Sequence, residues 1–400
     1  MPACSNNLKY ANMRFLYFVP LIIILGSCKS PEGGLYQFDP RTIGKKEIAL
    51  SELADDITYI PLDNSFPINM IYYPRYFIGD NIYLSERQSG VMIFDRNGRF
   101  IKKVGSKGRG PGEYAFCVNF SVDERSGTIC VMDANVIKVY SKTGRFLRKI
   151  ELREYSAGTD VLEFYNSEIF IPCHPQYTGV KHEWILFDTL GNIIKTKERS
   201  TPEFTGNDLI PGGIYKYENK LYSWNPWSDT IFSLSPDFIP EPSFVISPGQ
   251  HRLSREAYKR IEDAKLYFKP YLILESKNNI FTRYYWDNDL IIAVIDKKSG
   301  ESHSTALIKG PAVFGDNILG GIINDIDGGM RFQPQNYFVE NDREYLEGLI
   351  NPHEIKARVK TDEFKEFMAK YPEKKKVFEE LAGSMKETDN PVLMVVRLKK

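Results

Sequence analysis

Short apolar stretches alternate with polar turns along most of the chain. Four stretches share one pattern, in which an aromatic residue is followed by a polar turn and a second apolar stretch. Their sequences are FDRNGRF at 94–100, YSKTGRF at 140–146, FDTLGNI at 187–193 and FSLSPDF at 232–238. Alternating stretches joined by such turns are typical of β-hairpins. The pattern therefore predicts an all-β fold built from repeated hairpins.

These hairpins recur at an even spacing. Their leading aromatic residues, at 94, 140, 187 and 232, are 46, 47 and 45 positions apart, and a fifth copy follows at 295–300. A second hairpin precedes each copy. Two hairpins in about 45 residues make four strands, which is the usual length of one propeller blade. We predict a six-bladed β-propeller of four-stranded blades, with seven blades as the alternative.

The last blade is incomplete where the repeat places it. The predicted blades span 66–104, 115–150, 160–196, 213–245, 279–308 and 319–339. Apolar stretches near the two ends of the chain, Ile57–Leu62 and Pro391–Leu398, can supply the missing strands. Such pairing removes the open sheet edges that favour aggregation. The N- and C-terminal strands are therefore predicted to close the ring.

Two helical insertions interrupt the repeat, near 251–268 and at 341–386. In the first, Ser254–Ala264 has the pattern of a helix with Ser254 as its N-cap. In the second, Asn351-Pro352 and Thr361–Glu363 are helix starts. We expect the charged residues of this second insertion to face solvent. A cap over one mouth of the propeller is the alternative.

The amino-terminal segment has the features of a signal peptide. Arg14 precedes eleven apolar residues at 15–25, too few to cross a bilayer as a stable helix. We predict a signal peptide over 1–27. Met13 is an alternative start, which would leave residues 1–12 upstream of the protein.

A cysteine follows this segment in a lipid-attachment context. Leu25–Cys28, LGSC, resembles a bacterial lipobox, in which the peptide is cut before a cysteine that becomes joined to diacylglycerol. Cys28 is therefore the predicted lipidation site, with a plain signal peptide as the alternative. Residues 28–42 would form a lipidated tether, and 43–400 a single propeller domain.

Charge and cysteine content narrow the function classes. The chain carries 52 basic and 52 acidic residues and no basic stripe, so nucleic-acid binding is not expected. Three cysteines, Cys117, Cys130 and Cys173, lie in the propeller, and an odd number argues against a disulfide framework. We expect buried free thiols, with one Cys117–Cys130 pair as the alternative.

The glycine-rich segment VGSKGRGPGEY at 104–114 superficially resembles a phosphate loop. A phosphate loop leads into a helix, and its last glycine is followed by Lys and then Ser or Thr. Here Gly112 is followed by Glu113-Tyr114, and a strand-like stretch comes next. We predict a crossing from the outer strand of the first blade to the inner strand of the second.

No motif assigns a catalytic residue, a cofactor or a metal. The five histidines form no HExxH pair, and no G-x-S-x-G sequence is present. Asn324–Gly329, NDIDGG, loosely resembles a calcium loop, but its spacing does not fit an EF-hand. A turn with local side-chain hydrogen bonds is the preferred interpretation.

Two aromatic clusters are the candidate ligand-binding residues. They comprise Trp224, Trp227, Tyr284, Tyr285 and Trp286. Flat rings at a propeller mouth can stack on sugar rings or on apolar side chains of a partner. Packing between blades is the alternative use of these rings. Polar neighbours predict that Trp227 and Trp286 are the most exposed.

Several motifs together resemble those of a known family. They are the lipobox, Ile93–Gly98, Gly105–Tyr114, Asn324–Gly329 and Asp389–Leu393. With them, nearly the whole mature chain resembles the six-bladed β-propeller lipoproteins of Gram-negative bacterial envelopes, related to NHL-type propellers. The resemblance implies an outer-membrane lipoprotein of the cell envelope, and we expect it to face the periplasm.

Two functions are compatible with this resemblance. The first is non-catalytic binding of a ligand or protein partner, such as a glycan or an envelope protein, at one mouth. The alternative is a propeller enzyme, a lyase or hydrolase, acting on glycans. Carboxylates, His or Arg converging in the central channel would favour the enzyme, whereas a funnel lined by aromatic rings would favour binding.

Replacing the predicted lipidation site tests the membrane anchor. Cys28→Ala removes the thiol that would carry the lipid, so the protein should move from the membrane fraction to the soluble fraction. Cys173→Ala should leave the distribution unchanged. A Cys28→Ala protein that stays with the membrane would contradict the anchor.

Overall fold

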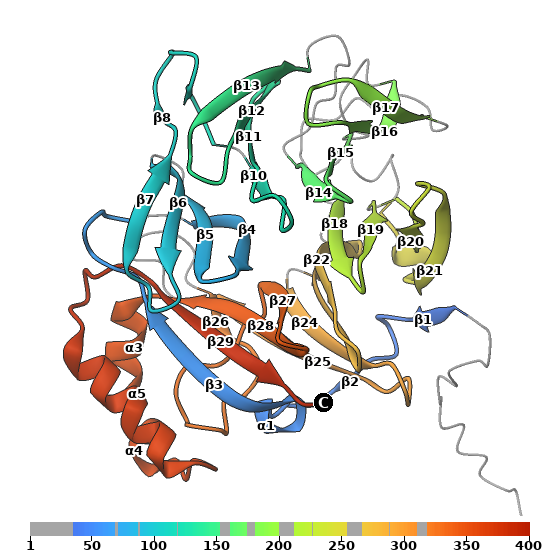
Figure 1. Cartoon of the computed structure of the whole chain (residues 1–400). Coiled ribbons are helices and arrows are strands. Elements are labelled where there is room, and N and C mark those ends of the chain that lie inside the picture. Colours follow the sequence, from blue (N-terminus) through green and yellow to red (C-terminus); the bar gives the residue numbers. More distant parts are fainter. Residues whose placement is uncertain are drawn as a thin grey trace, which may run out of the picture.

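Six small antiparallel sheets are arranged as a ring around a common centre (Figure 1). This computed structural model describes residues 35–68, 71–86, 89–117, 119–152, 161–173, 181–199, 212–225, 227–253, 266–287, 289–309 and 318–400. The all-β fold and the count of six blades are confirmed. The predicted signal peptide, Cys28 and the predicted helix Ser254–Ala264 lie outside the described residues.

The first five blades each use four consecutive strands, numbered outward from the centre of the ring. Blade 1 contains β4 (Ile71–Ile78), β5 (Asn81–Glu86), β6 (Gly90–Asp95) and β7 (Phe100–Val104). Blade 2 contains β10 (Asn119–Val122), β11 (Ile129–Asp133), β12 (Val136–Tyr140) and β13 (Phe146–Glu151). Blade 3 contains β14 (Glu163–Tyr165), β15 (Glu168–Pro172), β16 (His182–Phe187) and β17 (Ile193–Glu198). Blade 4 contains β18 (Gly213–Tyr217), β19 (Lys220–Trp224), β20 (Thr230–Leu234) and β21 (Pro240–Ile246). Blade 5 contains β22 (Lys269–Glu275), β23 (Asn279–Trp286), β24 (Asp289–Asp296) and β25 (Ser302–Lys309).

Blade 6 combines strands from both ends of the chain, as predicted. Its strands are β27 (Asn336–Glu340), β28 (Arg343–Ile350), β29 (Val392–Leu398) and β3 (Ala54–Pro61). β3 pairs antiparallel with β29, from Val392 opposite Pro61 to Val396 opposite Ile57. The N-terminal strand therefore forms the outer edge of the last blade and closes the ring.

Two predicted blade boundaries are wrong. Blade 5 was expected to begin at 279, but its first strand is β22, which follows the insertion near 251–268. The last blade was expected at 319–339, yet β26 (Ile318–Gly320) pairs with β25 of blade 5, and blade 6 begins at β27. Residues 343–350, assigned to the insertion at 341–386, form strand β28.

The fourth copy of the repeat was aligned two residues too early. In the turns after β6, β12 and β16, Phe94 pairs with Phe100, Tyr140 with Phe146, and Phe187 with Ile193. In blade 4 the corresponding pair is Leu234 and Pro240, not Phe232. The equivalent positions are therefore 94, 140, 187 and 234. Leu234 is apolar but not aromatic, which hid the true register.

A shared hydrogen-bond pattern explains the repeated turn sequence. The Asp95 carboxylate accepts hydrogen bonds from the backbone N–H groups of Asn97 and Arg99. Asp188 does the same for Leu190 and Asn192. Such side-chain bonds stabilise tight turns locally. Gly98 takes a φ of 80°, a conformation that glycine adopts without steric cost.

The N-terminal segment crosses the outer edges of two blades before it reaches blade 6. β1 (Tyr36–Phe38) pairs parallel with β21 of blade 4, and β2 (Gly44–Lys45) pairs parallel with β25 of blade 5. β1 falls within the segment 28–42 that was predicted as the tether. These additions cover strand edges that would otherwise be open.

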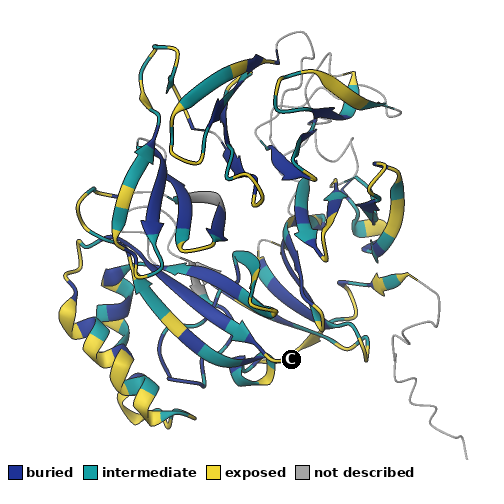
Figure 2. Ribbon diagram, viewed as in Figure 1, coloured by how far each residue is buried: buried dark blue, intermediate teal, exposed yellow. Residues whose placement is uncertain are grey.

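The helices lie beside blade 6, at the periphery of the ring rather than over its centre (Figure 1). α3 (Pro352–Arg358), α4 (Asp362–Glu366) and α5 (Pro372–Ser384) join β28 to β29, and a short helix, α1 (Leu50–Leu53), precedes β3. Asn351 and Thr361 are the predicted N-caps. Most charged residues of α4 and α5 face solvent, as expected (Figure 2), whereas Lys356 and Arg358 of α3 are half-buried and donate hydrogen bonds to backbone carbonyls. Among the helices in the described ranges, none is long and apolar enough to cross a bilayer.

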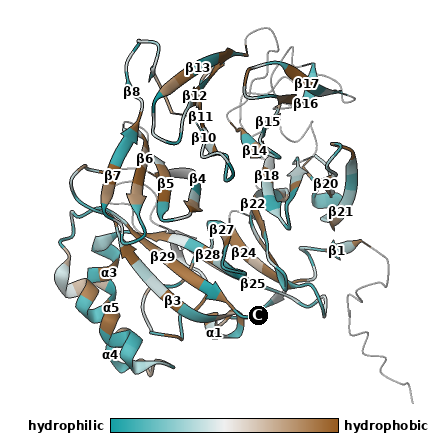
Figure 3. Ribbon diagram, in the orientation of Figure 1, coloured by the Kyte–Doolittle hydropathy of each residue, from teal (hydrophilic) through white to brown (hydrophobic). Residues whose placement is uncertain are grey.

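The hydrophobic core is divided among the interfaces between neighbouring blades. One cluster joins blade 1 to blade 2, and others join the remaining pairs around the ring. Strands such as β6, β24 and β29 carry these apolar residues (Figure 3). The free thiols of Cys117, Cys130 and Cys173 are buried here, as expected. Burial raises the pKa of Cys117 and of Cys173 to about 12, so both stay protonated.

The glycine-rich segment forms the predicted crossing between blades 1 and 2. Its two short strands, β8 (Ser106–Lys107) and β9 (Glu113–Tyr114), pair with each other. The Tyr114 hydroxyl donates a hydrogen bond to the Val104 carbonyl at 2.8 Å and accepts one from the Val91 N–H at 3.1 Å. Tyr114 is buried. The loop is therefore fastened to the blade it leaves.

Removing this hydroxyl should weaken the fold. Tyr114→Phe leaves the buried Val91 N–H and Val104 C=O without this partner, which should lower the free energy of unfolding by about 1–3 kcal/mol. Urea denaturation measures the change. Tyr271→Phe, at a ring that is 42% exposed, is the control and should change stability by less than about 0.5 kcal/mol. Equal effects of the two variants would contradict this role of Tyr114.

Candidate functional site

The two faces of the ring carry connections of different length. One face carries the turns that join the first strand of a blade to the second, as at 166–167 and 218–219. The turns that join the third strand to the fourth lie on the same face. We call this the short-turn face. The last strand of a blade ends, and the first strand of the next blade begins, on the opposite face, as at Glu151 and Glu163 or at Ile246 and Lys269, and the second-to-third links lie there too. We call it the long-connection face. Binding residues are found disproportionately on such loops.

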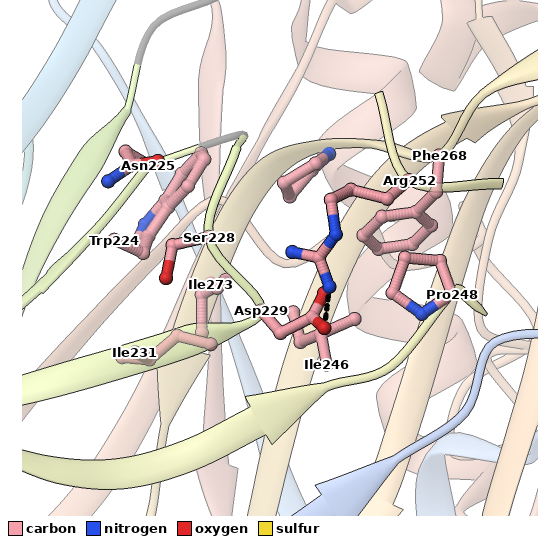
Figure 4. Close-up of a pocket in the computed structure, with 11 residues that line it drawn as sticks. Trp224, Asn225, Ser228, Asp229, Ile231, Ile246, Pro248, Arg252, Phe268 and Ile273 are labelled. Carbon is pink, nitrogen blue, oxygen red and sulfur yellow. Dashed lines mark ion pairs between the residues drawn. The ribbon is translucent and has the colours of Figure 1, made fainter. Parts of the chain in front are cut away.

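A pocket opens on the long-connection face between blades 4 and 5 (Figure 4). Trp224, Phe268 and Ile273 contribute apolar surface, and an ion pair between Arg252 and Asp229 borders it. Burial lowers the pKa of Arg252. The enclosed space has room for about one water molecule. In this form the pocket is therefore a preformed recess rather than a cavity for a whole ligand.

The structure brings three of the predicted aromatic residues together beside this pocket. Trp224 lines it, while the ring centres of Tyr284 and Trp286 lie 4.7 Å and 6.1 Å from that of Phe268. Trp224 and Tyr284 are buried, 7% and 1% exposed, so blade packing uses their rings. Trp286 is half-buried and also contacts His251.

The other two predicted rings lie apart from this group. Trp227 is half-buried and packs against Leu253. Tyr285 is also half-buried, but it packs with Leu290, Ile292 and Leu307 in a separate cluster of blade 5. Successive side chains of a strand point to opposite faces, so Tyr285 lies on the side of blade 5 opposite Tyr284.

A carboxylate shared by four blades was not anticipated from the sequence. Glu163, on the innermost strand β14, accepts hydrogen bonds from the Tyr76 hydroxyl at 2.9 Å and the Ser121 hydroxyl at 2.8 Å. The Lys216 ammonium lies 2.8 Å from its Oε1 atom. Tyr76, Ser121 and Lys216 come from the innermost strands of blades 1, 2 and 4. We call this group the Glu163 cluster.

The Glu163 cluster has the geometry of a structural connection. Oε1 accepts bonds from Ser121, Lys216 and the Phe164 N–H, and Oε2 accepts one from Tyr76. A general base must instead reach a substrate proton. Burial and the nearby Glu163 charge raise the pKa of Tyr76, which stays protonated. The arrangement therefore binds four blades together and leaves little capacity for acid–base chemistry.

Lys216 keeps its charge in this cluster. Burial lowers its pKa, but the charges of Glu163, Glu124 and Asp123 outweigh that effect, so the pKa is raised overall. Its contribution to stability is therefore present at neutral pH and lost only as the pH rises through the raised value.

Other buried polar pairs bridge neighbouring blades in the same manner. Arg75 of blade 1 donates to Glu347 of blade 6 at 2.5 Å. The Tyr215 hydroxyl of blade 4 donates to Glu275 of blade 5 at 2.9 Å, and Lys297 donates to the same carboxylate at 2.7 Å. These bonds converge from distant parts of the chain, and no local spacing in the sequence identifies them.

The calcium-like segment Asn324–Gly329 is a hydrogen-bonded turn. The buried Asp327 carboxylate accepts bonds from the Tyr59 hydroxyl at 2.7 Å, the Asn324 amide at 2.5 Å and the Gly329 N–H at 2.7 Å. Burial raises the pKa of Asp327. Within the described part of the chain, no group of three or more His, Cys, Asp or Glu residues is placed to hold a metal.

Substitution of Glu163 tests the cluster. Glu163→Gln removes the charge that pairs with Lys216, so the free energy of unfolding should fall by about 2 kcal/mol at neutral pH. Denaturant unfolding measures this loss. The control Glu151→Gln affects an exposed pair with Lys149 and should cost less than about 1 kcal/mol. An unchanged stability of Glu163→Gln would contradict the proposed connection of the blades.

Comparison with solved structures supports the propeller fold. A protein described as exported, from Bacteroides fragilis, matches with a TM-score of 0.67 and 18% identity, over 92% of this chain and 100% of the other. A member of the DUF4221 family from Bacteroides vulgatus matches with a TM-score of 0.50 and 13% identity, over 89% and 100%. At these identities the likeness shows the fold alone.

A third solved structure matches more weakly, and two sequence comparisons concern relatives and the family. A streptogramin B lyase has a TM-score of 0.43 and 14% identity, over 72% of this chain and 94% of the lyase, and carries no argument about activity. No curated protein matches. The predicted relationship to NHL-type propeller lipoproteins therefore stays a prediction. The model of DUF4934, a domain of unknown function, matches residues 35–397, and the chain belongs to this family.

Proposed function

We propose that the protein is an envelope lipoprotein that binds a glycan or an envelope protein at its long-connection face, without catalysis. The observation that carries this proposal is the difference between the two faces. One consists of tight, hydrogen-bonded turns, whereas the other holds the longer links, the recess between blades 4 and 5, and the half-buried rings of Trp227, Tyr285 and Trp286.

The hydrogen bonds within the Glu163 cluster favour binding over catalysis. Carboxylates converging in the channel would support a glycan lyase or hydrolase if their oxygens were available to a substrate. Both Glu163 oxygens instead accept hydrogen bonds from the protein itself. A binding role requires no such group. A glycan-cleaving enzyme remains the alternative that the experiment below tests.

The path of the N-terminal segment is compatible with a lipid anchor at Cys28. β1 lies on the outer edge of blade 4, so the tether would leave from the rim of the ring. The eight residues from Cys28 to Tyr36 span at most about 28 Å. Such a tether would leave the long-connection face accessible. The exported character of the B. fragilis protein supports the envelope, and we propose the periplasmic side of the outer membrane.

A binding screen tests this function. The mature protein is screened against immobilised glycans and envelope extracts, and turnover of the glycans is measured in the same wells. We expect binding without turnover. Trp227→Ala combined with Trp286→Ala should weaken that binding at least about tenfold, because buried aromatic contacts often dominate affinity.

The matched control alters apolar residues on the short-turn face. Leu190 and Ile239 lie in the turns at 188–192 and 235–239 and are 65% and 55% exposed. Leu190→Ala combined with Ile239→Ala should leave affinity unchanged. Glycan turnover, or a loss of binding caused by this control pair instead of the tryptophan pair, would contradict the proposal.

A further inference from the structure

Arg283, on the second strand of blade 5, is buried without an acceptor for two of its nitrogen atoms. The residue is 4% exposed. Among the described residues, nothing accepts a hydrogen bond from its Nε or Nη1 atom. Buried polar groups in folded proteins are almost always hydrogen-bonded, and an exception calls for an explanation.

A second buried arginine among the described residues, Arg75, shows which contacts Arg283 lacks. Arg75, 2% exposed, contacts the Glu347 carboxylate at 2.5 Å and the Gln335 side-chain oxygen at 3.0 Å. The Arg283 guanidinium carbon lies 5.7 Å from the ring centre of Tyr271. A cation–π contact offsets only part of the cost of burying a charge and provides no hydrogen-bond acceptor.

The surroundings of Arg283 reach the long-connection face. Tyr271, on innermost strand β22, is 42% exposed, and its ring centre lies 6.1 Å from that of Tyr285. The Lys269 ammonium lies 5.8 Å from the Tyr285 ring centre. Lys269 begins β22 directly after the link at 247–268. A buried cation thus lies beside an exposed ring, with a second cation near the mouth.

We propose that this group, the Arg283 site, receives an oxyanion carried by the ligand of the long-connection face. A carboxylate, sulfate or phosphate group supplies the acceptors that Nε and Nη1 lack, and charge-assisted hydrogen bonds of this kind are strong. The exposed Tyr271 ring would move aside to admit the group and then contact the ligand. The inference rests on the proposed function and adds that its ligand is acidic.

The site is separate from the recess between blades 4 and 5. That recess is lined by Ile273, whereas Arg283 shares its strand face with Tyr285, on the opposite side of blade 5. The Arg283 site and the recess, one on each side of β22, would therefore contact the same ligand. Arg283 would select the acidic group, and the aromatic residues near the recess would contact its apolar surface.

Replacing Arg283 by an apolar residue of similar length separates binding from folding. Arg283→Met removes an unpaired buried charge, so the melting temperature without ligand should stay the same or rise. The control Arg75→Met leaves Glu347 buried without its cation, so its melting temperature should fall. This opposite pair of shifts distinguishes an unpaired arginine from a paired one without any ligand.

Titration with defined polymers and ions tests the acidic ligand. The probes are polygalacturonate for carboxylate, dextran sulfate for sulfate, neutral dextran, and inorganic sulfate and phosphate, followed by calorimetry. We expect the wild type to bind at least one acidic polymer and not neutral dextran. Arg283→Met should weaken that binding at least about tenfold.

Three results would overturn the Arg283 site, and one of them leaves the proposed function intact. Unchanged affinity of Arg283→Met for the acidic polymers, or a wild type that binds none of the oxyanion probes, overturns the Arg283 site. If the wild type then still binds a neutral glycan or an envelope protein through Trp227 and Trp286, the proposed function stands. A fall in the melting temperature of Arg283→Met as large as that of Arg75→Met also overturns the inference.

Discussion

The fold depends on the pairing of β3 with β29. A ring of six blades has stable edges only if the last blade is completed, and here residues 54–61 supply its outer strand opposite residues 392–398. The pairing joins two segments that are more than three hundred positions apart in the chain. It fixes blade 6 against blade 1, where the Arg75–Glu347 bond and an apolar cluster complete the contact.

Closure of the ring also determines which hydrogen-bond partners a buried polar group meets. In the closed ring the innermost strands converge, so a carboxylate such as Glu163 meets donors from three other blades. Both of its oxygen atoms then accept hydrogen bonds from the protein. Arg283 is the contrasting case, because it is buried in blade 5 and no described residue accepts a hydrogen bond from its Nε or Nη1 atom.

The sequence predicted the features that are encoded locally. Aromatic residues before the turns at Asp95, Ser141 and Asp188 revealed the blade length, because each turn depends on its own side-chain and glycine conformations. The terminal strands were recognisable because an incomplete blade must be closed. The register of the fourth copy was missed because Leu234 replaces the aromatic residue there.

Features that depend on convergence were not predictable from spacing. Tyr76, Ser121, Glu163 and Lys216 are each more than forty positions apart, and only the ring brings them together. The aromatic candidates lie in blades 4 and 5, where the repeat placed them, and their role as ligand contacts stays a prediction. Two of the rings, Trp224 and Tyr284, are buried, and three, Trp227, Tyr285 and Trp286, are half-buried. This difference depends on how Phe268 packs against Tyr284 and on which side of β23 each ring lies. The sequence pattern alone gives neither.

The assignment of one face to binding is the central claim, and a hydrogen-exchange footprint tests it most directly. Exchange is compared between the free protein and the protein saturated with the strongest ligand from the screen. The account predicts slower exchange in the segments 221–231, 247–253, 266–273 and 283–287. Slower exchange confined to the turns at 96–99, 141–145 and 188–192 would show that the ligand binds the opposite face and would contradict the account.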